Sequence, residues 1–177
     1  LGPNGAGKTT TIRHIMGYIK ADSGNVTIDN LDAWKHIQKV QSKIGYLPGE
    51  ISFFDDMTGK QFLHFIAKYR HLKSFDFAEQ LIKRFELDTH GKIKSMSKGM
   101  KQKIAIVCAF MHDPQILILD EPTSGLDPLM QNRFIELLLE EKQKEKTILM
   151  SSHMFEEIEK TCNQIAIIKD GKIIENN

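Results

Sequence analysis

The sequence L-G-P-N-G-A-G-K-T-T, residues 1–10, organises the rest of this chain, because residues 2–9 fit the pattern G-x-x-x-x-G-K-[ST]. In that pattern glycines let the backbone turn sharply and bring its N–H groups against phosphate oxygens. Lys8 supplies a positive charge for the β- and γ-phosphates, and the Thr9 hydroxyl is placed to hold Mg²⁺. Residues 10–16 read as a helix whose N-terminal dipole also favours phosphate, whereas the alternative for the pattern by itself is a chance glycine-rich turn. The predicted phosphate-binding residues are Gly2, Pro3, Asn4, Gly5, Ala6, Gly7, Lys8, Thr9 and Thr10.

Composition and charge exclude several classes of protein. The 177 residues suffice for about one domain with a substantial core. The 24 Lys and Arg residues nearly balance the 23 Asp and Glu residues, so neither nucleic acid nor an anionic membrane is expected as the main partner. Cys108 and Cys162 stand far apart without a C-x-x-C motif, which favours neither a disulfide framework nor a zinc site. The longest apolar run, residues 104–111, is far shorter than the ~20 residues that span a bilayer, so a cytoplasmic protein is expected.

Helices and strands alternate near both ends of the sequence, as they do in an α/β domain. After the first helix, the predicted elements are a strand at 25–29, a short helix at 34–40 and a strand at 44–47. Later in the chain, a continuous apolar run at 116–119 is typical of a central parallel strand that is buried on both faces. The elements predicted after it are a helix capped by Asp127 and ending near 142, a strand at 147–150, a helix at 155–161, a strand at 164–168 and a hairpin turn at 170–171.

Three helices without an intervening strand are predicted between these parts. Thr58-x-x-Gln61 is a capping box, and apolar residues recur after it at helical spacing. A second amphipathic helix is expected at 75–87, and Ser97 is placed to cap a third that ends near residue 111. We therefore predict an α/β core made of residues 1–50 and 112–177, with a helical subdomain, residues 51–111, inserted into it.

Polar side chains follow two of the buried strands, at the edge where ligands sit in open α/β sheets. Asp120 and Glu121 come directly after strand 116–119, and they can divide the work because neighbouring side chains of an extended strand point opposite ways. Asp120 would hold Mg²⁺ directly or through water, and Glu121 would polarise the attacking water. His153 closes strand 147–150, so it is expected at the same edge, where it can hydrogen-bond a γ-phosphate. The alternatives are an acidic loop edge in solvent and a histidine that is merely exposed or structural.

Five motifs, in the order G-P-N-G-A-G-K-T, M-S-K-G-M, L-I-L-D-E-P, S-G-L-D and S-S-H, resemble the nucleotide-binding domain of an ATP-binding cassette (ABC) protein. The resemblance covers essentially the whole chain and implies a P-loop NTPase core with a mostly parallel sheet and an inserted helical subdomain. It makes residues 2–9 the Walker A loop, 116–120 the Walker B strand and 124–127 the D-loop, with ATP and Mg²⁺ as the bound groups. The further roles that it implies are catalysis for Glu121 and His153, metal binding for Thr9 and Asp120, and ATP binding for Ser97, Gly99 and Asp127.

Residues 96–100, M-S-K-G-M, occupy the position of the family signature, which is usually L-S-G-G-Q. Ser97 and the N–H groups of Lys98 and Gly99 begin a helix, and a helix start favours anions. A domain that carries one such helix start and one phosphate loop, held apart, invites head-to-tail pairing of two copies around two ATP molecules. The alternative is an ordinary serine cap.

Three features depart from the family pattern. Lys98 replaces the first signature glycine, and Met100 replaces the usual glutamine. Gly49 and Glu50 follow the Tyr-Leu-Pro strand where the family has glutamine, and Glu50 can supply an oxygen from one residue further on. The aromatic residue that usually stacks on adenine lies before the Walker A loop, outside this sequence, so the base-binding residue is not assigned.

The two ends of the sequence favour the interpretation that the chain is a piece cut from a longer protein. A phosphate loop normally follows a buried strand, of which Leu1 is expected to be the last residue. At the other end, residues 176–177 follow a strand-like segment without a finishing element. We expect such a piece to bind nucleotide weakly and to be poorly stable, with strand 116–119 or 147–151 along an open edge.

We interpret the chain as the Mg²⁺-dependent ATPase subunit of an ABC transporter, held on the inner face of the cell membrane by a separate transmembrane permease subunit. The segments Y-L-P-G-E and S-K-G-M-K-Q-K resemble those of bacterial exporters for drugs or peptides. An aromatic-rich stretch that contains Phe53, Phe54, Phe62 and Phe65 is the candidate surface for docking the permease. The alternative is that all four aromatic residues belong to the core.

The alternative function is that of a soluble ABC ATPase that acts on ribosomes and carries a second cassette. Members that act on DNA contain a long coiled coil, whereas the segment between Lys8 and Ser97 shows no sustained heptads. A GTPase is disfavoured because the sequence contains no guanine-reading N-K-x-D motif. The transported substrate stays open, since the membrane subunits of ABC transporters choose it.

Overall fold

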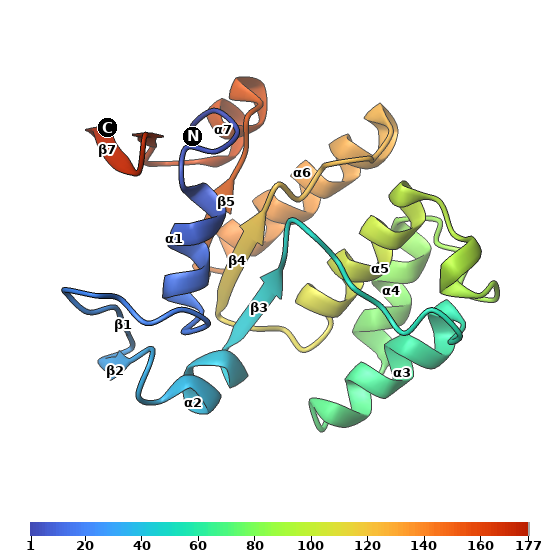
Figure 1. Cartoon of the computed structure of the whole chain (residues 1–177). Coiled ribbons are helices and arrows are strands. Elements are labelled where there is room, and N and C mark those ends of the chain that lie inside the picture. Colours follow the sequence, from blue (N-terminus) through green and yellow to red (C-terminus); the bar gives the residue numbers. More distant parts are fainter. Residues whose placement is uncertain (177) are drawn as a thin grey trace.

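Three parallel strands form the centre of the structure, a computed structural model that describes residues 1–176 (Figure 1). Strand β4 (Ile116–Asp120) lies between β3 (Ile44–Leu47) and β5 (Thr147–Ser151). Leu117 and Ile118 of β4 are almost completely buried, as expected for a strand that is covered on both faces. The prediction of a buried central strand is therefore confirmed.

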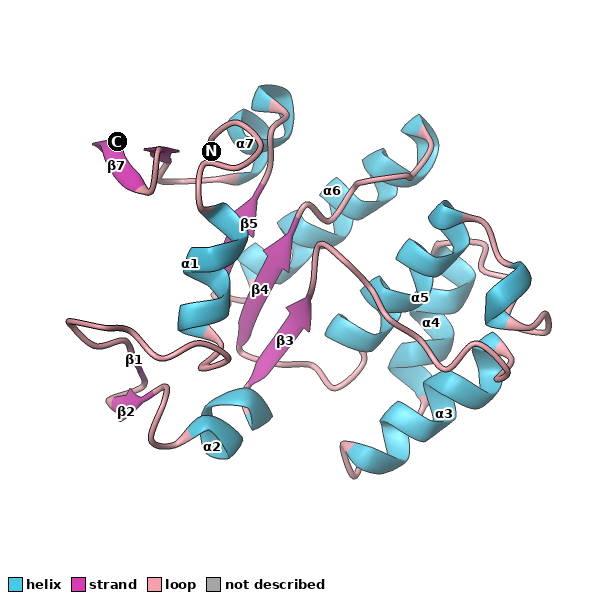
Figure 2. Ribbon diagram, in the orientation of Figure 1, coloured by secondary structure: helices cyan, strands magenta, loops and turns pink. Residues whose placement is uncertain are grey.

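Helices cover both faces of this sheet (Figure 2). On one face, α1 (Lys8–Ile15) and α2 (Ile37–Ser42) pack in one apolar cluster with Ile118. On the other face, α5 (Lys98–Phe110) and α6 (Pro128–Gln143) pack in a second cluster. The residues of β4 that belong to this second cluster are Leu117 and Leu119. The alternation of side chains along β4 thus assigns α1 and α5 to opposite faces.

A group of helices lies beside the sheet and contains α3 (Gly59–Tyr69), α4 (Asp76–Arg84) and α5. A short 3₁₀-helix, Ile93–Ser95, precedes α5. No strand occurs between β3 and β4 in the structure, as the sequence predicts. Leu63 of α3 and Leu81 of α4 belong to the same apolar cluster as residues of the sheet. The division of the chain into a core and an inserted helical subdomain at residues 51 and 111 therefore stays a prediction.

Each of the three predicted capping residues begins a helix. The Thr58 hydroxyl accepts a hydrogen bond from the Gln61 N–H at 3.2 Å, and the Gln61 side chain accepts one from the Thr58 N–H at 2.9 Å. Ser97 and Asp127 accept hydrogen bonds from the backbone three residues further on, at 3.2 and 3.0 Å. These bonds satisfy backbone N–H groups that otherwise lack a partner at a helix start.

The strand predicted at residues 25–29 is present but shorter, and it forms one half of a small hairpin. Strands β1 (Thr27–Ile28) and β2 (Leu31–Asp32) pair antiparallel around Asp29 and Asn30. Both turn residues have positive φ angles, 49° and 61°, which suit a tight two-residue hairpin. The chain therefore reverses direction before the predicted strand is complete.

A second hairpin lies next to the phosphate loop. Strands β6 (Ala166–Lys169) and β7 (Lys172–Asn176) pair antiparallel around the predicted turn. The backbone of Leu1 pairs with β6, because its N–H group donates to the Ala166 carbonyl at 2.7 Å and its carbonyl accepts from the Ile168 N–H at 2.8 Å. Helix α7 (Phe155–Thr161) joins β5 to this hairpin.

Of the two strands predicted to lie along an open edge, 116–119 or 147–151, the second is at an edge of the sheet, whereas β4 pairs with a neighbour on each side. Strands β3 and β5 are the two edge strands of the three-stranded sheet. A cavity of about 760 Å³, lined by apolar residues such as Ile148, Met150 and Ile168, lies between β5 and β6. Among residues 1–176, no helix has both the length and the apolar character needed to cross a bilayer.

Candidate functional site

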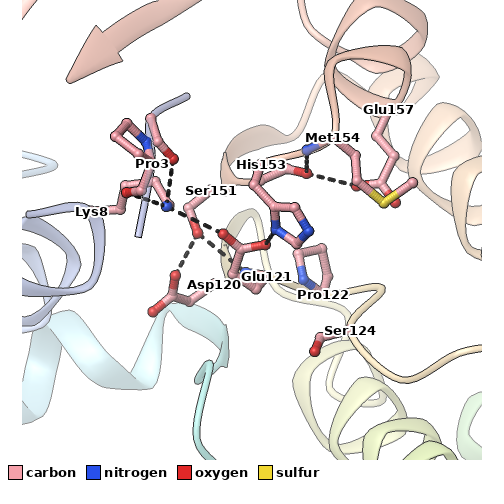
Figure 3. A network of polar contacts seen from close by, with 12 residues as sticks. Pro3, Lys8, Asp120, Glu121, Pro122, Ser124, Ser151, His153, Met154 and Glu157 are labelled. Atoms are coloured by element: carbon pink, nitrogen blue, oxygen red, sulfur yellow. Dashed lines mark hydrogen bonds and ion pairs between the residues drawn. The ribbon is translucent and has the colours of Figure 1, made fainter. Parts of the chain in front are cut away.

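The start of α1 meets the carboxyl ends of β4 and β5, and Figure 3 shows the polar network at this point. The preceding loop passes through Gly5 and Gly7, whose φ angles of 79° and 108° are readily adopted only by glycine. The Gly171 N–H of the β6–β7 turn donates to the Ala6 carbonyl at 2.9 Å. The loop is thereby fixed against the hairpin, with the first turn of α1 directly behind it.

Lys8 folds back over the phosphate loop instead of extending into solvent. Its ammonium donates to the carbonyls of Gly2 and Pro3 at 2.7 and 3.2 Å, and its side chain is only 9% exposed. The same ammonium lies 3.4 Å from a carboxylate oxygen of Glu121. A nucleotide phosphate would compete with this carboxylate for the lysine, since both are anions.

Asp120 is completely buried, and hydroxyl groups satisfy both of its carboxylate oxygens. Thr9 donates to Oδ2 at 2.7 Å, and Ser151 donates to Oδ1. A Cβ atom at Gly49 would lie 3.1 Å from Oδ2, so a glycine there leaves room beside the carboxylate. The Thr9 hydroxyl and the Asp120 carboxylate are the kinds of oxygen ligand that Mg²⁺ takes from a protein when phosphates and water supply the rest.

Glu121 lies at the point where the chain leaves β4. Its φ angle of 50° is left-handed, and its N–H donates to both the carbonyl and the hydroxyl of Ser151 at 3.1 Å. The prediction that alternation along an extended strand separates Asp120 from Glu121 is therefore wrong, because the strand ends at Asp120. The turn instead aims the Glu121 carboxylate at Lys8 on one side and at His153 on the other.

His153 joins the network from the segment after β5. Its Nδ1 lies 2.7 Å from Oε2 of Glu121, and its side chain is 60% exposed. The predicted placement of His153 at the same edge as Asp120 is confirmed by this contact. The imidazole thus has one nitrogen on the carboxylate and a face open to a ligand from solvent.

Two serines that the sequence reading did not single out organise this edge. Ser151 holds Asp120 and the Glu121 N–H together. The Ser152 hydroxyl donates to Glu157 at 2.9 Å and accepts from the Met154 N–H, also at 2.9 Å, which shapes the turn that carries His153. The signal was present in the string S-S-H, since two hydroxyl residues at the end of a buried strand must find partners on both faces.

Ser97, Gly99 and Asp127 are not part of this cluster. They lie at the starts of α5 and α6, and α5 packs on the face of β4 opposite to α1 (Figure 1). The Asp127 carboxylate is engaged as a helix cap. One copy of the chain therefore does not bring these residues to the phosphate loop.

Tyr46 of β3 adds no negative charge beside Asp120. Burial raises the pKa of Tyr46 to about 12, and the neighbouring Tyr18 and Asp120 act in the same direction. Because this phenol stays protonated at neutral pH, the acidic groups of the site are the two carboxylates of Asp120 and Glu121.

Comparisons with known proteins agree with this geometry. Residues 1–124 match the family model described as ABC transporter. The ABC transporter ATP-binding protein NatA of Bacillus subtilis is 39% identical over 180 residues, which cover 98% of this chain and 73% of NatA. The linearmycin resistance ATP-binding protein LnrL of the same species is 38% identical, and the bacitracin transport ATP-binding protein BcrA of Bacillus licheniformis is 36% identical. The matches cover 98% and 99% of this chain but only 58% of either relative.

Solved structures give the same result for the fold. The structure of an ATP-binding subunit of an ABC transporter has a TM-score of 0.90 and 32% identity, and the match covers 100% of this chain and 76% of that one. A dimeric ATP-binding cassette in a post-hydrolysis state, bound to ADP and phosphate, has a TM-score of 0.88 over 99% of this chain and 82% of its own. At 23% identity, the second likeness supports the fold alone.

Proposed function

Because this chain belongs to the ABC transporter family, as an ATP-binding domain, we propose that it hydrolyses ATP with Mg²⁺ to power a separate membrane permease. The observation that carries the proposal is the convergence of Lys8, Asp120, Glu121 and His153 on one edge of the sheet. This cluster combines a phosphate-binding cation, a buried carboxylate for a metal and a second carboxylate next to an imidazole.

ATP binding begins with its phosphates at the loop. The β- and γ-phosphates accept from the backbone N–H groups at residues 5–9 and from Lys8, which exchanges its contact with Glu121 for one with phosphate. Thr9 and Asp120 would hold Mg²⁺, which when bound neutralises charge that develops on the phosphates. This arrangement frees Oε1 of Glu121.

Glu121 then orients and polarises the attacking water through the carboxylate oxygen that Lys8 has released. Its Oε2 is already held by His153, so the carboxylate has a fixed direction. In its doubly protonated form His153 can donate to Glu121 from Nδ1 and to the γ-phosphate from Nε2, and it would in this way report whether that phosphate is present. Ser97, Gly99 and Asp127 of a second, head-to-tail copy complete the site across the interface.

The work done with ATP is proposed from the relatives. LnrL is named for linearmycin resistance and BcrA for bacitracin transport, so we propose export of a drug or peptide. A permease would hold the protein on the inner face of the membrane. The exposed rings of Phe54 and Phe65, whose centroids lie 5.6 Å apart, offer it a docking surface.

The test is ATP turnover by the full-length protein with Glu121→Gln. We expect ATP binding to persist and turnover to fall at least ~100-fold, because the amide cannot act as a base. Removal of Mg²⁺ by a chelator should abolish turnover in the unsubstituted protein. Glu145→Gln, an exposed substitution of the same kind, should leave turnover unchanged. Near-normal hydrolysis in Glu121→Gln would remove Glu121 from catalysis and overturn the proposed mechanism.

A further inference from the structure

The start of α5 is tied to the loop that follows Glu121, residues 122–127, by a side chain that the family pattern does not contain. The Lys98 ammonium donates to the Ser124 hydroxyl at 2.9 Å. One turn further along α5, the buried Gln102 side chain donates to the Pro122 carbonyl at 2.7 Å. Figure 3 shows that Pro122 and Ser124 lead away from the Lys8 side of the site.

The two segments also approach closely along their backbones. A Cβ atom at Gly99 would lie 2.7 Å from the Gly125 carbonyl oxygen, which leaves no room for a side chain. Gly125 has a φ of 81°, and a Cβ atom there would lie 3.0–3.3 Å from Cγ, Cδ and Cε of Lys98. The stem of Lys98 therefore lies over Gly125 while its ammonium reaches Ser124.

Helix stability does not explain a lysine at this position. Lys98 is the first residue of α5, and a cation at a helix start opposes the helix dipole. The first turn contains no acidic residue that could compensate it. The bond to Ser124 is also exposed to solvent, where it stabilises the folded chain little.

We propose that Lys98 is a positioning residue that fixes Ser124 relative to the signature segment, residues 96–100. This inference rests on the proposed function, in which the signature segment and the loop 124–127 both face the nucleotide of a second copy. With Lys98 in place, the two segments reach that nucleotide as one unit. A glycine at position 98 would remove this bond and leave the Gln102 hydrogen bond and the Gly99–Gly125 contact in place.

The experiment compares Lys98→Met, Ser124→Ala and the double variant of the full-length protein. Methionine keeps most of the stem over Gly125 and removes the donor. We expect each single variant to lower kcat about fivefold and to reduce the Hill coefficient for ATP, with KM little changed. The double variant should be no slower than either single variant, because both remove the same bond. Lys98→Arg, which retains a donor, should recover most of the rate.

Amide hydrogen exchange of the nucleotide-free protein gives a second readout that needs no turnover. Lys98→Met should raise exchange in residues 123–127, while Lys101→Met, which removes a charge from the same helix turn, should change neither exchange nor kcat. Wild-type kcat and Hill coefficient in Lys98→Met, or additive losses in the double variant, would overturn the proposal. Failure of the proposed function shows separately, as normal turnover in Glu121→Gln.

Discussion

Asp120 has no contact with solvent, yet it must carry a charge if it is to hold a metal ion. A buried carboxylate is costly unless its oxygens are hydrogen-bonded, and here Thr9 and Ser151 supply hydroxyl donors from two different elements. Hydroxyls suit this role because each can donate to the carboxylate when no cation is present. When a cation binds the carboxylate, the hydroxyl can rotate and offer its oxygen as an acceptor or ligand instead. The two hydroxyls therefore stabilise the Asp120 carboxylate without a metal, and the proposed Mg²⁺ would replace part of this hydrogen bonding.

We predict that removal of the Ser151 hydroxyl lowers both the stability of the fold and the rate of ATP turnover. Ser151→Ala removes the donor to Oδ1 of the buried Asp120 carboxylate. It also removes one of the two acceptors of the Glu121 N–H. We expect the free energy of unfolding to fall by about 2 kcal/mol, the range for hydrogen bonds to charged groups, and turnover to fall several-fold. Chemical denaturation and ATPase assays of the full-length protein measure both. Ser42→Ala, an exposed control, should stay within about 0.5 kcal/mol, and an equal effect in both variants would contradict the argument.

The half-buried His112 is expected to make the stability of the fold depend on pH. It lies away from the cluster of Lys8, Glu121 and His153, with Nε2 at 3.2 Å from the Ile44 carbonyl and Nδ1 buried without a partner. Burial lowers the pKa of His112 from 6.5 to about 4, and the charge of Arg70 acts in the same direction. Between these two values the unfolded chain takes up a proton that the folded chain does not. Stability is therefore lost as pH falls through this window.

The test compares the unsubstituted protein with His112→Gln, which retains a side-chain donor for the Ile44 carbonyl and cannot titrate. Allowing for screening by solvent, we expect the unsubstituted protein to lose about 1 kcal/mol more than the variant between about pH 7.5 and about pH 5. Urea unfolding at the two pH values measures the difference. Parallel losses in the two proteins would assign the acid sensitivity to other groups.

At the scale of elements, features fixed by neighbouring residues are predictable from the sequence, and features fixed by distant ones are not. The caps at Thr58 and Ser97 follow from short local patterns, and β4 follows from its unbroken apolar run. The φ of 50° at Glu121 accompanies hydrogen bonds to Ser151, thirty residues away. Strand alternation therefore predicts that Glu121 lies at this edge of the sheet, but it does not predict how the side chain is directed. The bond from Lys98 to Ser124 likewise joins segments that no local pattern connects.

The small hairpin shows a different discrepancy, in which the predicted strand is present but is shortened by a turn signal at its end. Asp29 and Asn30 both favour the left-handed turn that reverses the chain, whereas the alternation of residues 25–29 suggests a longer strand. The turn ends β1 after Ile28, so that the strands on either side contain only two residues each. Weak alternation over five residues does not outweigh a good two-residue turn.

The aromatic stretch at the start of α3 divides between core and surface, and it predicts separate effects for its members. Phe62 is 8% exposed, whereas Phe54 and Phe65 are 55% and 43% exposed. Phe54→Ser should lower the free energy of unfolding by no more than about 1 kcal/mol and leave basal ATP hydrolysis intact, while reducing permease-coupled transport. Phe62→Ser should unfold the domain or cost it about 3 kcal/mol or more.

Vesicles that contain the permease measure transport for these variants beside the ATPase rate of the free protein. Trp34→Ser, at a residue 47% exposed but outside α3, is the matched control and should leave transport unchanged. Full transport in Phe54→Ser and in Phe65→Ser would assign the exposed rings no part in docking. Equal loss in the control would indicate a general effect of removing exposed aromatic side chains.

At the scale of the whole molecule, the sheet separates the two elements that are proposed to bind ATP, the phosphate loop and the signature segment. The phosphate loop leads into α1 on one face of β4, and Ser97 begins α5, which packs on the other face. The phosphate loop and the signature segment of one chain lie on opposite faces of the sheet and do not meet. In a two-fold pair, the phosphate loop of each copy would face the signature segment of the other copy. In the proposed function ATP would lie at this interface, and its binding would then favour the dimer by mass action.

We therefore expect full-length Glu121→Gln to form a dimer with ATP and Mg²⁺, because nucleotide stays intact and holds both copies together. Analytical ultracentrifugation should show a twofold rise in molar mass with ATP and no rise with ADP, which lacks the γ-phosphate that bridges to the signature segment. The double variant Lys8→Ala/Glu121→Gln is the control, since it loses the charge that holds the phosphates and should remain a monomer. A dimer that forms equally without nucleotide would show that ATP is not the bridge. A variant that binds ATP and stays monomeric would show that the signature segment has no role across an interface, and the site would then have to be completed within one chain.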